Sequence, residues 1–331
     1  MNQDIFDRIS NVTVLVVGDV MIDAYAWSRV DRISPEAPVP VAHVVKRENR
    51  LGGAANVALN VQALGAKAII CSVIGDDSNG DVLRSTLKSG GFSTEGIIDS
   101  PGRCTTVKTR IIAQGHHLLR MDDENTHNLS PTDERHLLDC IRRVLDKHSI
   151  GAIVFEDYNK GVITRRVIDE VISMAKGRGI ITCVDPKKEN FLNYKGVDLF
   201  KPNLKELREG LHVNIVKDDL DSVRHGISEL QKNLECKYVM TTLSEKGVMV
   251  FDGNEYTHIP AHRREIVDVS GAGDTVIALA AVLLAAECNI VQAARIANLA
   301  GGLVCEMTGV VPVSLEKLKK EMISLEAGLS E

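Results

Sequence analysis

Short, uninterrupted apolar runs recur along the chain and are separated by amphipathic segments. Five runs rich in β-branched residues predict strands buried on both faces of a parallel sheet, at residues 12–17, 68–74, 152–155, 180–184 and 238–242. Apolar side chains at three- and four-residue spacing predict helices over 54–64, 164–176 and 220–233. Strands that alternate with helices predict an α/β fold, a doubly wound, mostly parallel sheet with helices on both faces. In such folds, ligands bind at the carboxyl ends of the strands.

Two segments break this alternation. Val39–Val45 follows a proline-rich turn, and Cys104–Ile112 is a threonine-rich strand pattern that carries charges. Both predict antiparallel strands set apart from the main sheet. No repeat, low-complexity tract or linker-like stretch interrupts the chain. We therefore expect a single domain over residues 1–331, with a small β-strand lid formed from about 24–48 and 97–121.

Composition and charge exclude several classes of protein. Hydrophobic residues make up 44% of the chain and charged residues 25%, as in ordinary globular proteins. The formal net charge is −6 and aromatic residues are only 4%, so no nucleic-acid partner is expected. The longest apolar run, 276–286, is shorter than the ~20 residues of a membrane-spanning helix, so no membrane association is expected. Seven scattered cysteines without a Cys-x-x-Cys pair, and no secretory signal, predict a cytoplasmic location.

The sharpest chemical motif is Asp268–Asp274, which leads directly into an apolar helix. Its small residues Gly271, Ala272 and Gly273 let several backbone N–H groups face one point, and a helix start adds a positive dipole end. Such an anion hole can stabilise the charge that develops on a transferred phosphoryl group. Asp274 can accept the proton of an attacking hydroxyl. The alternative is an ordinary helix cap after a glycine turn.

Weaker features precede this motif. The pair Gly52–Gly53 allows close backbone approach ahead of a helix in which Asn56 can reach a ligand hydroxyl. Asp19 and Asp23 follow the first strand, where carboxylates can accept hydrogen bonds from sugar hydroxyls. Ordinary turns and helix starts explain these residues almost equally well.

Asn203 and Glu206 lie three residues apart and share a face if a helix begins there. Such an oxygen pair suits Mg²⁺ held mainly through water and phosphate. A helix-capping pair is an equally good interpretation.

Taken together, these motifs resemble the ribokinase (PfkB) family of carbohydrate kinases. Gly52–Gly75 matches the family's N-terminal pattern, Asp268–Asp274 its C-terminal pattern, and Asn203 with Glu206 its Asn-x-x-Glu. The resemblance implies a ribokinase-like fold and the use of ATP and Mg²⁺. It also implies that Asp274 is the catalytic base beside an anion hole of Gly271, Ala272 and Gly273.

The same resemblance implies further roles, residue by residue. The sugar would be held by Asp19 or Asp23 together with Gly52, Gly53 and Asn56. Asn203 and Glu206 would organise Mg²⁺ and the ATP phosphates, with Glu206 acting through water. The family's Thr-x-Gly-x-x-Gly slot is filled by Thr242, Ser244 and Gly247, with Ser244 replacing the first glycine, and Asn298 would flank the adenine. Asp268 is a candidate neighbour of a monovalent cation such as K⁺, with a structural turn carboxylate as the alternative.

Residues 18–23, 32–41, 157–161 and 185–187 show a closer resemblance, to the kinases of bacterial ADP-heptose synthesis. That resemblance implies phosphorylation of D-glycero-β-D-manno-heptose 7-phosphate at carbon 1, for lipopolysaccharide synthesis. Because there is no His-x-Gly-His, the stand-alone kinase form is expected. A phosphorylated substrate needs basic groups far from Asp274. The candidates are Lys108, Arg110, Arg120, Lys160 and Lys187, each with a solvated surface charge as the alternative.

Two other functions compete with this interpretation. The chain could be a related kinase for another sugar phosphate, such as fructose 1- or 6-phosphate, or a non-catalytic regulator that binds a sugar phosphate. A dinucleotide-binding oxidoreductase is disfavoured, because Gly18-Asp19 stands where a Gly-x-Gly-x-x-Gly would follow the first strand. Because the edge strands of a small lid need covering, we expect a homodimer formed through the lid.

Overall fold

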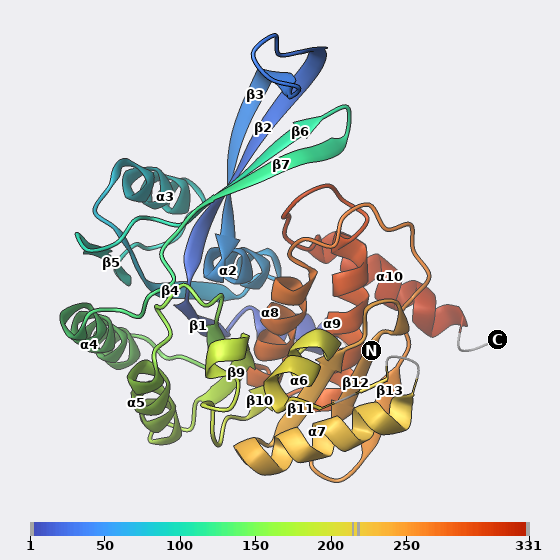
Figure 1. Ribbon diagram of the computed structural model, residues 1–331. Helices are drawn as coiled ribbons and strands as arrows, with labels where there is room; N and C mark the ends of the chain where they lie inside the picture. The colour runs from blue at the N-terminus through green and yellow to red at the C-terminus, as the bar shows by residue number, and fades with distance from the viewer. Residues whose placement is uncertain (1–2, 214, 217–218, 329–331) are drawn as a thin grey trace.

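The computed structural model describes residues 3–213, 215–216 and 219–328. Its main sheet has nine strands, shown in Figure 1. In spatial order they are β13 (Tyr256–Ile259), β12 (Val248–Phe251), β11 (Tyr238–Thr242), β10 (Leu199–Phe200), β9 (Ile181–Asp185), β8 (Ala152–Glu156), β1 (Thr13–Gly18), β4 (Lys67–Gly75) and β5 (Ile97–Ser100). Neighbours from β11 to β5 pair in parallel, and β12 and β13 add an antiparallel edge. The five predicted strands are confirmed as β1, β4, β8, β9 and β11.

Helices cover both faces of this sheet. One face carries α1 (Gln3–Ile9), α2 (Ala54–Ala63), α3 (Ser78–Ser89), α8 (Ala272–Ala285), α9 (Ile290–Val304) and α10 (Leu315–Gly328). The other carries α4 (Pro131–Lys147), α5 (Arg165–Lys176), α6 (Leu204–Leu211) and α7 (Leu220–Leu234). The predicted helices are confirmed as α2, α5 and α7. Across the described residues, every helix is too short or too polar to cross a bilayer.

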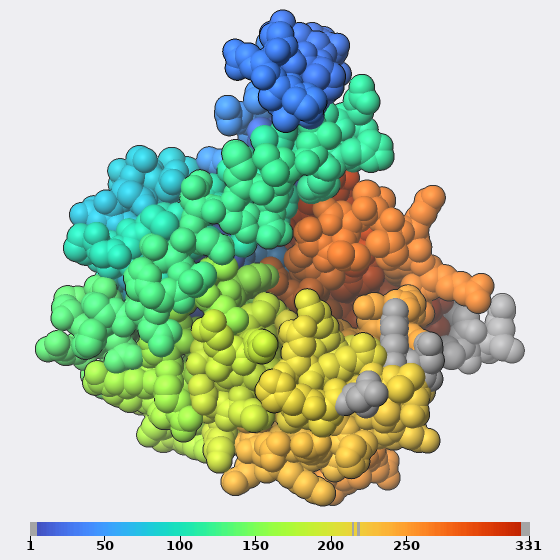
Figure 2. Space-filling model, viewed as in Figure 1, coloured from blue at the N-terminus to red at the C-terminus, as the bar shows by residue number. Residues whose placement is uncertain are grey.

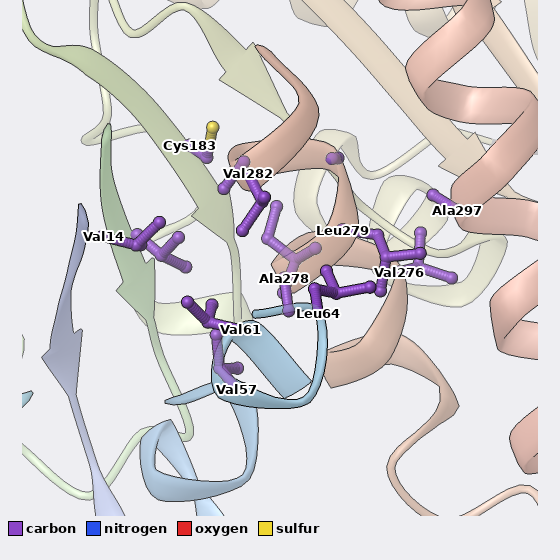
Figure 3. Packing of buried hydrophobic residues seen from close by; sticks show 14 of the residues in the cluster. Val14, Val57, Val61, Leu64, Cys183, Val276, Ala278, Leu279, Val282 and Ala297 are labelled. Carbon is purple, nitrogen blue, oxygen red and sulfur yellow. The ribbon is translucent and has the colours of Figure 1, made fainter. Parts of the chain in front are cut away.

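The apolar runs of the sequence are explained by this two-sided covering. Successive side chains of β1 point to opposite faces, so Val14 packs beneath α2 and α8 while Leu15 packs toward α4 and α5. Figure 3 shows Val14 beside Val61 of α2 and Val282 of α8. Burial on both faces leaves no position for a polar side chain from Val14 to Val17 of β1, and α8 is apolar from Val276 onward because the sheet, α2 and α9 enclose it.

A second sheet of four strands projects from the body of the molecule, and its tip stands clear of the rest in Figures 1 and 2. This projecting sheet consists of β3 (Pro40–Gly53), β2 (Val20–Ile33), β6 (Val107–Ala113) and β7 (His116–Asp123). Two antiparallel hairpins, β2–β3 and β6–β7, are joined by a parallel pairing of β2 with β6, where the sequence predicted antiparallel strands only.

The boundary of the projecting sheet also differs from the predicted lid. Residues near 97 were expected to begin its second segment, but β5 pairs with β4 in the main sheet because Ile97 is buried there. The second segment therefore begins at Val107. The first begins at Val20, directly after β1, and this places the base of the projecting sheet at the carboxyl ends of the central strands.

Candidate active site

The start of α8 forms a glycine-lined corner at the carboxyl end of the main sheet. Gly271 precedes the helix with φ 79°, a left-handed conformation that favours glycine. A Cβ there would lie 2.8 Å from Nδ2 of Asn56, so a larger residue does not fit. The first turn leaves the N–H groups of Gly273 and Asp274 without intrahelical acceptors. The N–H of Ala272, a predicted anion-hole donor, is instead bonded to the carbonyl of Val269 over 3.3 Å.

Asp274 is buried and held from two sides. Nδ2 of Asn56 donates to Oδ2 of Asp274 over 2.7 Å, and the hydroxyl of Tyr158 donates to Oδ1 over 2.8 Å. Burial raises the pKa of Asp274, an effect that the bond from Asn56 opposes and the nearby charge of Asp185 reinforces. Each carboxylate oxygen keeps a lone pair, so the group can still accept a proton.

Two further carboxylates lie beside Asp274. Glu156 ends β8 and Asp185 ends β9, and the two residues pair in register on adjacent parallel strands. One carboxylate oxygen from each of Glu156, Asp185 and Asp274 lies within 4.8 Å of the other two. Lys201 pairs with Asp185 over 2.9 Å. Oε2 of Glu156 is buried, and no described residue forms a hydrogen bond with it. Burial, followed by the charges of Asp185 and Asp274, raises the pKa of Glu156 well above its usual range.

This carboxylate group has the oxygen donors that Mg²⁺ prefers, and the unpaired Oε2 of Glu156 points to a cation. Glu156 was not predicted from the sequence, and no role was expected for Asp185. The available signal was small, because each is a single acidic residue that ends an otherwise uncharged strand.

The two residues that were predicted to organise Mg²⁺ are engaged in hydrogen bonds at a helix start. Asn203 and Glu206 form a reciprocal capping box at the start of α6, so the capping interpretation describes this structure. The remaining oxygen of Glu206 pairs with the ammonium group of Lys187.

Lys187 was predicted to bind a substrate phosphate, and the structure places it beside Tyr158. Its ammonium nitrogen lies 5.4 Å from the ring centre of Tyr158, whose hydroxyl contacts Asp274. The reason is local, since Lys187 follows Asp185 by two residues and β9 ends at the carboxylate group.

Asp19 organises the loop that carries Tyr158. Its carboxylate accepts hydrogen bonds from the backbone N–H groups of Tyr158, Lys160 and Val162, over 2.8, 3.1 and 3.1 Å. Burial and the charge of Asp157 raise the pKa of Asp19 to about 6. This carboxylate has a structural role, because three amides bond to it and it is only 1% exposed, and the sugar contact stays a prediction.

The base of the projecting sheet holds the other predicted sugar-binding residues. Asp23 is ion-paired with Arg110, which lies over the ring of Tyr25. A Cβ at Gly52 would lie 2.4 Å from Oδ2 of Asp23, and Gly53 adopts φ 59°. The two glycines therefore let β3 cross close to this ion pair.

Lys108 and Lys160 converge on one carboxylate. Their ammonium nitrogens lie 3.1 and 2.7 Å from the oxygens of Glu124, and Lys108 also contacts Asp122. Arg120 pairs with Asp122 from the solvent side, with its side chain 56% exposed. The structure thus brings two of the predicted basic residues together and leaves Arg120 outside the cluster.

The predicted nucleotide residues lie at the end of β11, in the turn that follows it and in the middle of α9. Thr242 ends β11, and Ser244 adopts φ 54°, the left-handed conformation that glycine would accept more readily. Gly247 adopts φ 87°, where a Cβ would meet the carbonyl of Ile259 at 2.1 Å. Nδ2 of Asn298 donates to the carbonyl of Pro260 over 2.9 Å.

Asp268 links two loops. Its oxygens accept hydrogen bonds from the N–H groups of Ser270 and Gly309, each over 2.9 Å. Although burial opposes the effect, these bonds lower the pKa of Asp268. Both oxygens are engaged by backbone, which favours the structural interpretation over a K⁺ neighbour.

Comparison with known proteins agrees with this geometry. Residues 12–318 match the pfkB family of carbohydrate kinases. The chain belongs to this family. As a carbohydrate kinase, it is a phosphotransferase.

Relatives of this kinase include the "Bifunctional protein HldE" of Geobacter sulfurreducens, 37% identical over 94% of the chain, and that of Helicobacter pylori, 37% identical over 92%. The kinase spans only 63% and 65% of those proteins' lengths. Among solved structures, phosphofructokinase-2 from Escherichia coli in complex with potassium has TM-score 0.79 at 20% identity, covering 96% of this chain and 99% of its own. Arabidopsis thaliana ribokinase complexed with ribose and ATP has TM-score 0.73 at 18% identity, covering 94% and 99%. These two structures share the fold.

Proposed function

We propose that this kinase uses ATP to phosphorylate the carbon-1 hydroxyl of D-glycero-β-D-manno-heptose 7-phosphate, giving the 1,7-bisphosphate. The observation that carries the proposal is the buried Asp274, fixed by Tyr158 and Asn56 beside the free N–H groups of α8. Similarity to HldE proteins over more than nine-tenths of the chain supports a heptose phosphate as the acceptor.

Asp274 would accept the proton of the attacking hydroxyl as that oxygen bonds to the γ-phosphorus of ATP and the bond from this phosphorus to the β–γ bridging oxygen breaks, releasing ADP. The N–H groups at the start of α8 would stabilise negative charge on the transferred phosphoryl group. Lys187, which lies beside Tyr158, would approach the ATP phosphates. The protein's main contribution is to align acceptor and donor.

Mg²⁺ supplies charge neutralisation for the ATP phosphates when it is bound. Glu156 and Asp185 would hold the ion, directly or through water, because their oxygens lie together and Oε2 of Glu156 has no partner among the described residues. Glu206 is engaged by Lys187 and its own capping box, so we assign it a secondary role.

The acceptor's phosphate would bind at Lys108 and Lys160. Tyr158 contacts Asp274, while Lys160, two residues further along the same loop, pairs with Glu124, the residue after β7 of the projecting sheet. A sugar phosphate can thus lie along this loop with its hydroxyl at Asp274 and its phosphate at the lysines. Closure of the projecting sheet as a lid would then exclude water and limit hydrolysis of ATP.

We also propose a homodimer formed through the projecting sheet. Its edge strands β3 and β7 expose apolar side chains, including Val45 at 65% and Leu119 at 54%. Unpaired apolar edges favour association. Light scattering at micromolar concentration should give the mass of two chains, and Val45→Asp should shift it toward one chain. A wild-type monomer would refute the dimer.

The substrate assignment is tested by ADP release with a panel of acceptors. Heptose 7-phosphate should give a higher kcat/KM than fructose 1-phosphate or fructose 6-phosphate, and unphosphorylated heptose should be poor. Preference for a fructose phosphate would overturn the heptose assignment while leaving the kinase intact. ATP-dependent turnover of none of these acceptors would favour a non-catalytic sugar-phosphate-binding regulator.

A further inference from the structure

The projecting sheet is hydrogen-bonded to a loop that reaches the anion hole. The buried hydroxyl of Tyr25, on β2, accepts a hydrogen bond from the N–H of Val310 over 3.1 Å. Nη1 of Arg50, on β3, donates to the carbonyls of Thr308 and Val310 over 3.2 and 3.3 Å. Two strands of the projecting sheet therefore hold residues 308–310 from one side.

The same loop contacts the anion hole from its other side. A Cβ on Gly271 would lie 3.4 Å from Cγ1 of Val310, so the two residues pack directly. Asp268 ties Gly309 to Ser270, the residue before Gly271. Residues 308–310 are thus held between the projecting sheet and the glycine that sets the N–H groups of α8.

Close packing restricts the movement of residues 308–310 against Tyr25 and Arg50. Gly309 adopts φ 76°, and a Cβ there would lie 2.7 Å from Nη1 of Arg50 and 2.9 Å from the hydroxyl of Tyr25. The guanidinium carbon of Arg50 lies 4.8 Å from the ring centre of Tyr25, so the two side chains support each other. Movement of β2 and β3 must shift residues 308–310 or break these bonds.

We propose that Tyr25 and Arg50 are positioning residues that couple the projecting sheet to the anion hole through residues 308–310. The inference rests on phosphoryl transfer at α8 and not on which sugar is the acceptor. Arg110 of the sugar-binding region also lies 5.5 Å from the ring centre of Tyr25. Binding of the acceptor near Arg110 can thereby change the geometry of the phosphoryl-transfer corner through the side chain of Tyr25.

The single tryptophan of the chain provides a direct probe. Trp27 lies on β2 and stacks on Tyr25, with ring centres 6.1 Å apart. Binding of a non-hydrolysable ATP analogue with Mg²⁺ should change Trp27 fluorescence in the wild type. In Tyr25→Phe, calorimetry should show the analogue bound with the wild-type affinity within about twofold, while the fluorescence change falls by at least about half, because only the link is broken.

Steady-state kinetics distinguish a positioning role of Tyr25 and Arg50 from a role in folding. Tyr25→Phe should lower kcat about tenfold with KM for ATP unchanged, since one lost hydrogen bond displaces the anion hole without removing a nucleotide contact. Arg50→Lys keeps the charge but cannot reach both carbonyls, so it should show the same pattern. Tyr256→Phe, on β13, is the matched control and should behave as wild type.

The outcomes are distinct. If Tyr25→Phe and Arg50→Lys both bind the analogue and both keep the wild-type fluorescence change and the wild-type kcat, the proposed coupling is overturned. The proposed function is then unaffected. An equal loss of kcat and analogue affinity, with a lowered melting midpoint, would make the two residues merely structural and also overturn it. Failure of the wild type to bind the analogue would overturn the nucleotide site, and with it the proposed function.

Discussion

The hydroxyl of Tyr158 donates a hydrogen bond to Oδ1 of Asp274, over 2.8 Å. Tyr158 comes from the loop after β8, and Asp274 from the first turn of α8, so the bond fixes the carboxylate relative to two separate elements. Donation to a carboxylate favours its ionised form, which opposes the rise in the pKa of Asp274 that burial causes.

Tyr158→Phe should therefore raise the pKa of Asp274 further. The base must be ionised to accept a proton, so activity is lost as the pH falls through this pKa. In the variant, the acid limb of the kcat–pH profile should move to higher pH, and kcat at neutral pH should fall about tenfold. An acid limb at its wild-type position would show that the hydroxyl does not act on Asp274, and Tyr256→Phe supplies the control profile.

Asp274→Asn should abolish turnover while preserving binding. The amide keeps the shape of the carboxylate but cannot take the hydroxyl proton, so kcat should fall by about 10²–10⁴. Affinities for ATP and the sugar phosphate, measured by calorimetry, should stay within about tenfold, because binding involves many other groups. Near-normal activity in a coupled ADP assay would remove Asp274 from its assigned role.

Glu156→Gln should stabilise the metal-free protein at neutral and alkaline pH. The pKa of Glu156 is raised in the folded state, chiefly by burial and then by Asp185 and Asp274, so the folded chain binds this proton more tightly than the unfolded chain. The stability that this group contributes is present at low pH and lost as the pH rises above its ordinary pKa. Urea unfolding should show Glu156→Gln more stable by about 1–3 kcal/mol near pH 8, with the gap closing toward pH 4.

Added Mg²⁺ should reverse that order. A cation that binds only the folded state stabilises it by mass action, and its carboxylate ligand is lost in Glu156→Gln. The increase in unfolding free energy on adding Mg²⁺ should thus be smaller in the variant than in the wild type. Glu255→Gln, an exposed change in the β12–β13 turn, should respond as wild type. Equal responses in all three proteins would place the ion elsewhere.

The sequence predicted the central sheet well because burial on both faces restricts stretches such as Val14–Val17 of β1 to apolar residues. It predicted Asp274 because the Gly-Ala-Gly turn and the helix are contiguous in the chain. Glu156 could not be predicted from the sequence, because a single glutamate at the end of a strand becomes a candidate metal ligand only when Asp185 and Asp274 fold beside it. Capping and metal binding favour the same Asn203–Glu206 spacing, and only the observed hydrogen bonds distinguish them.

Lys160→Met and Lys108→Met should weaken binding of the sugar phosphate specifically. Both ammonium groups lie beside Glu124 at the base of the projecting sheet, away from the Asp274 end of the loop. Loss of one charge-assisted hydrogen bond to a phosphate corresponds to about 1.5–3 kcal/mol, a rise in KM of about 10–100-fold. The KM for ATP should not change, because the proposed function assigns both lysines to the acceptor's phosphate.

Unphosphorylated heptose is the control substrate for the two lysine variants. It offers no phosphate to the lysines, so its low kcat/KM should be the same in the wild type and both variants. Lys67→Met, an exposed change at the start of β4, should leave both acceptors unaffected. A loss of equal size for the phosphorylated and unphosphorylated sugars would mean that Lys108 and Lys160 act through Glu124 on the loop, and that the phosphate binds elsewhere.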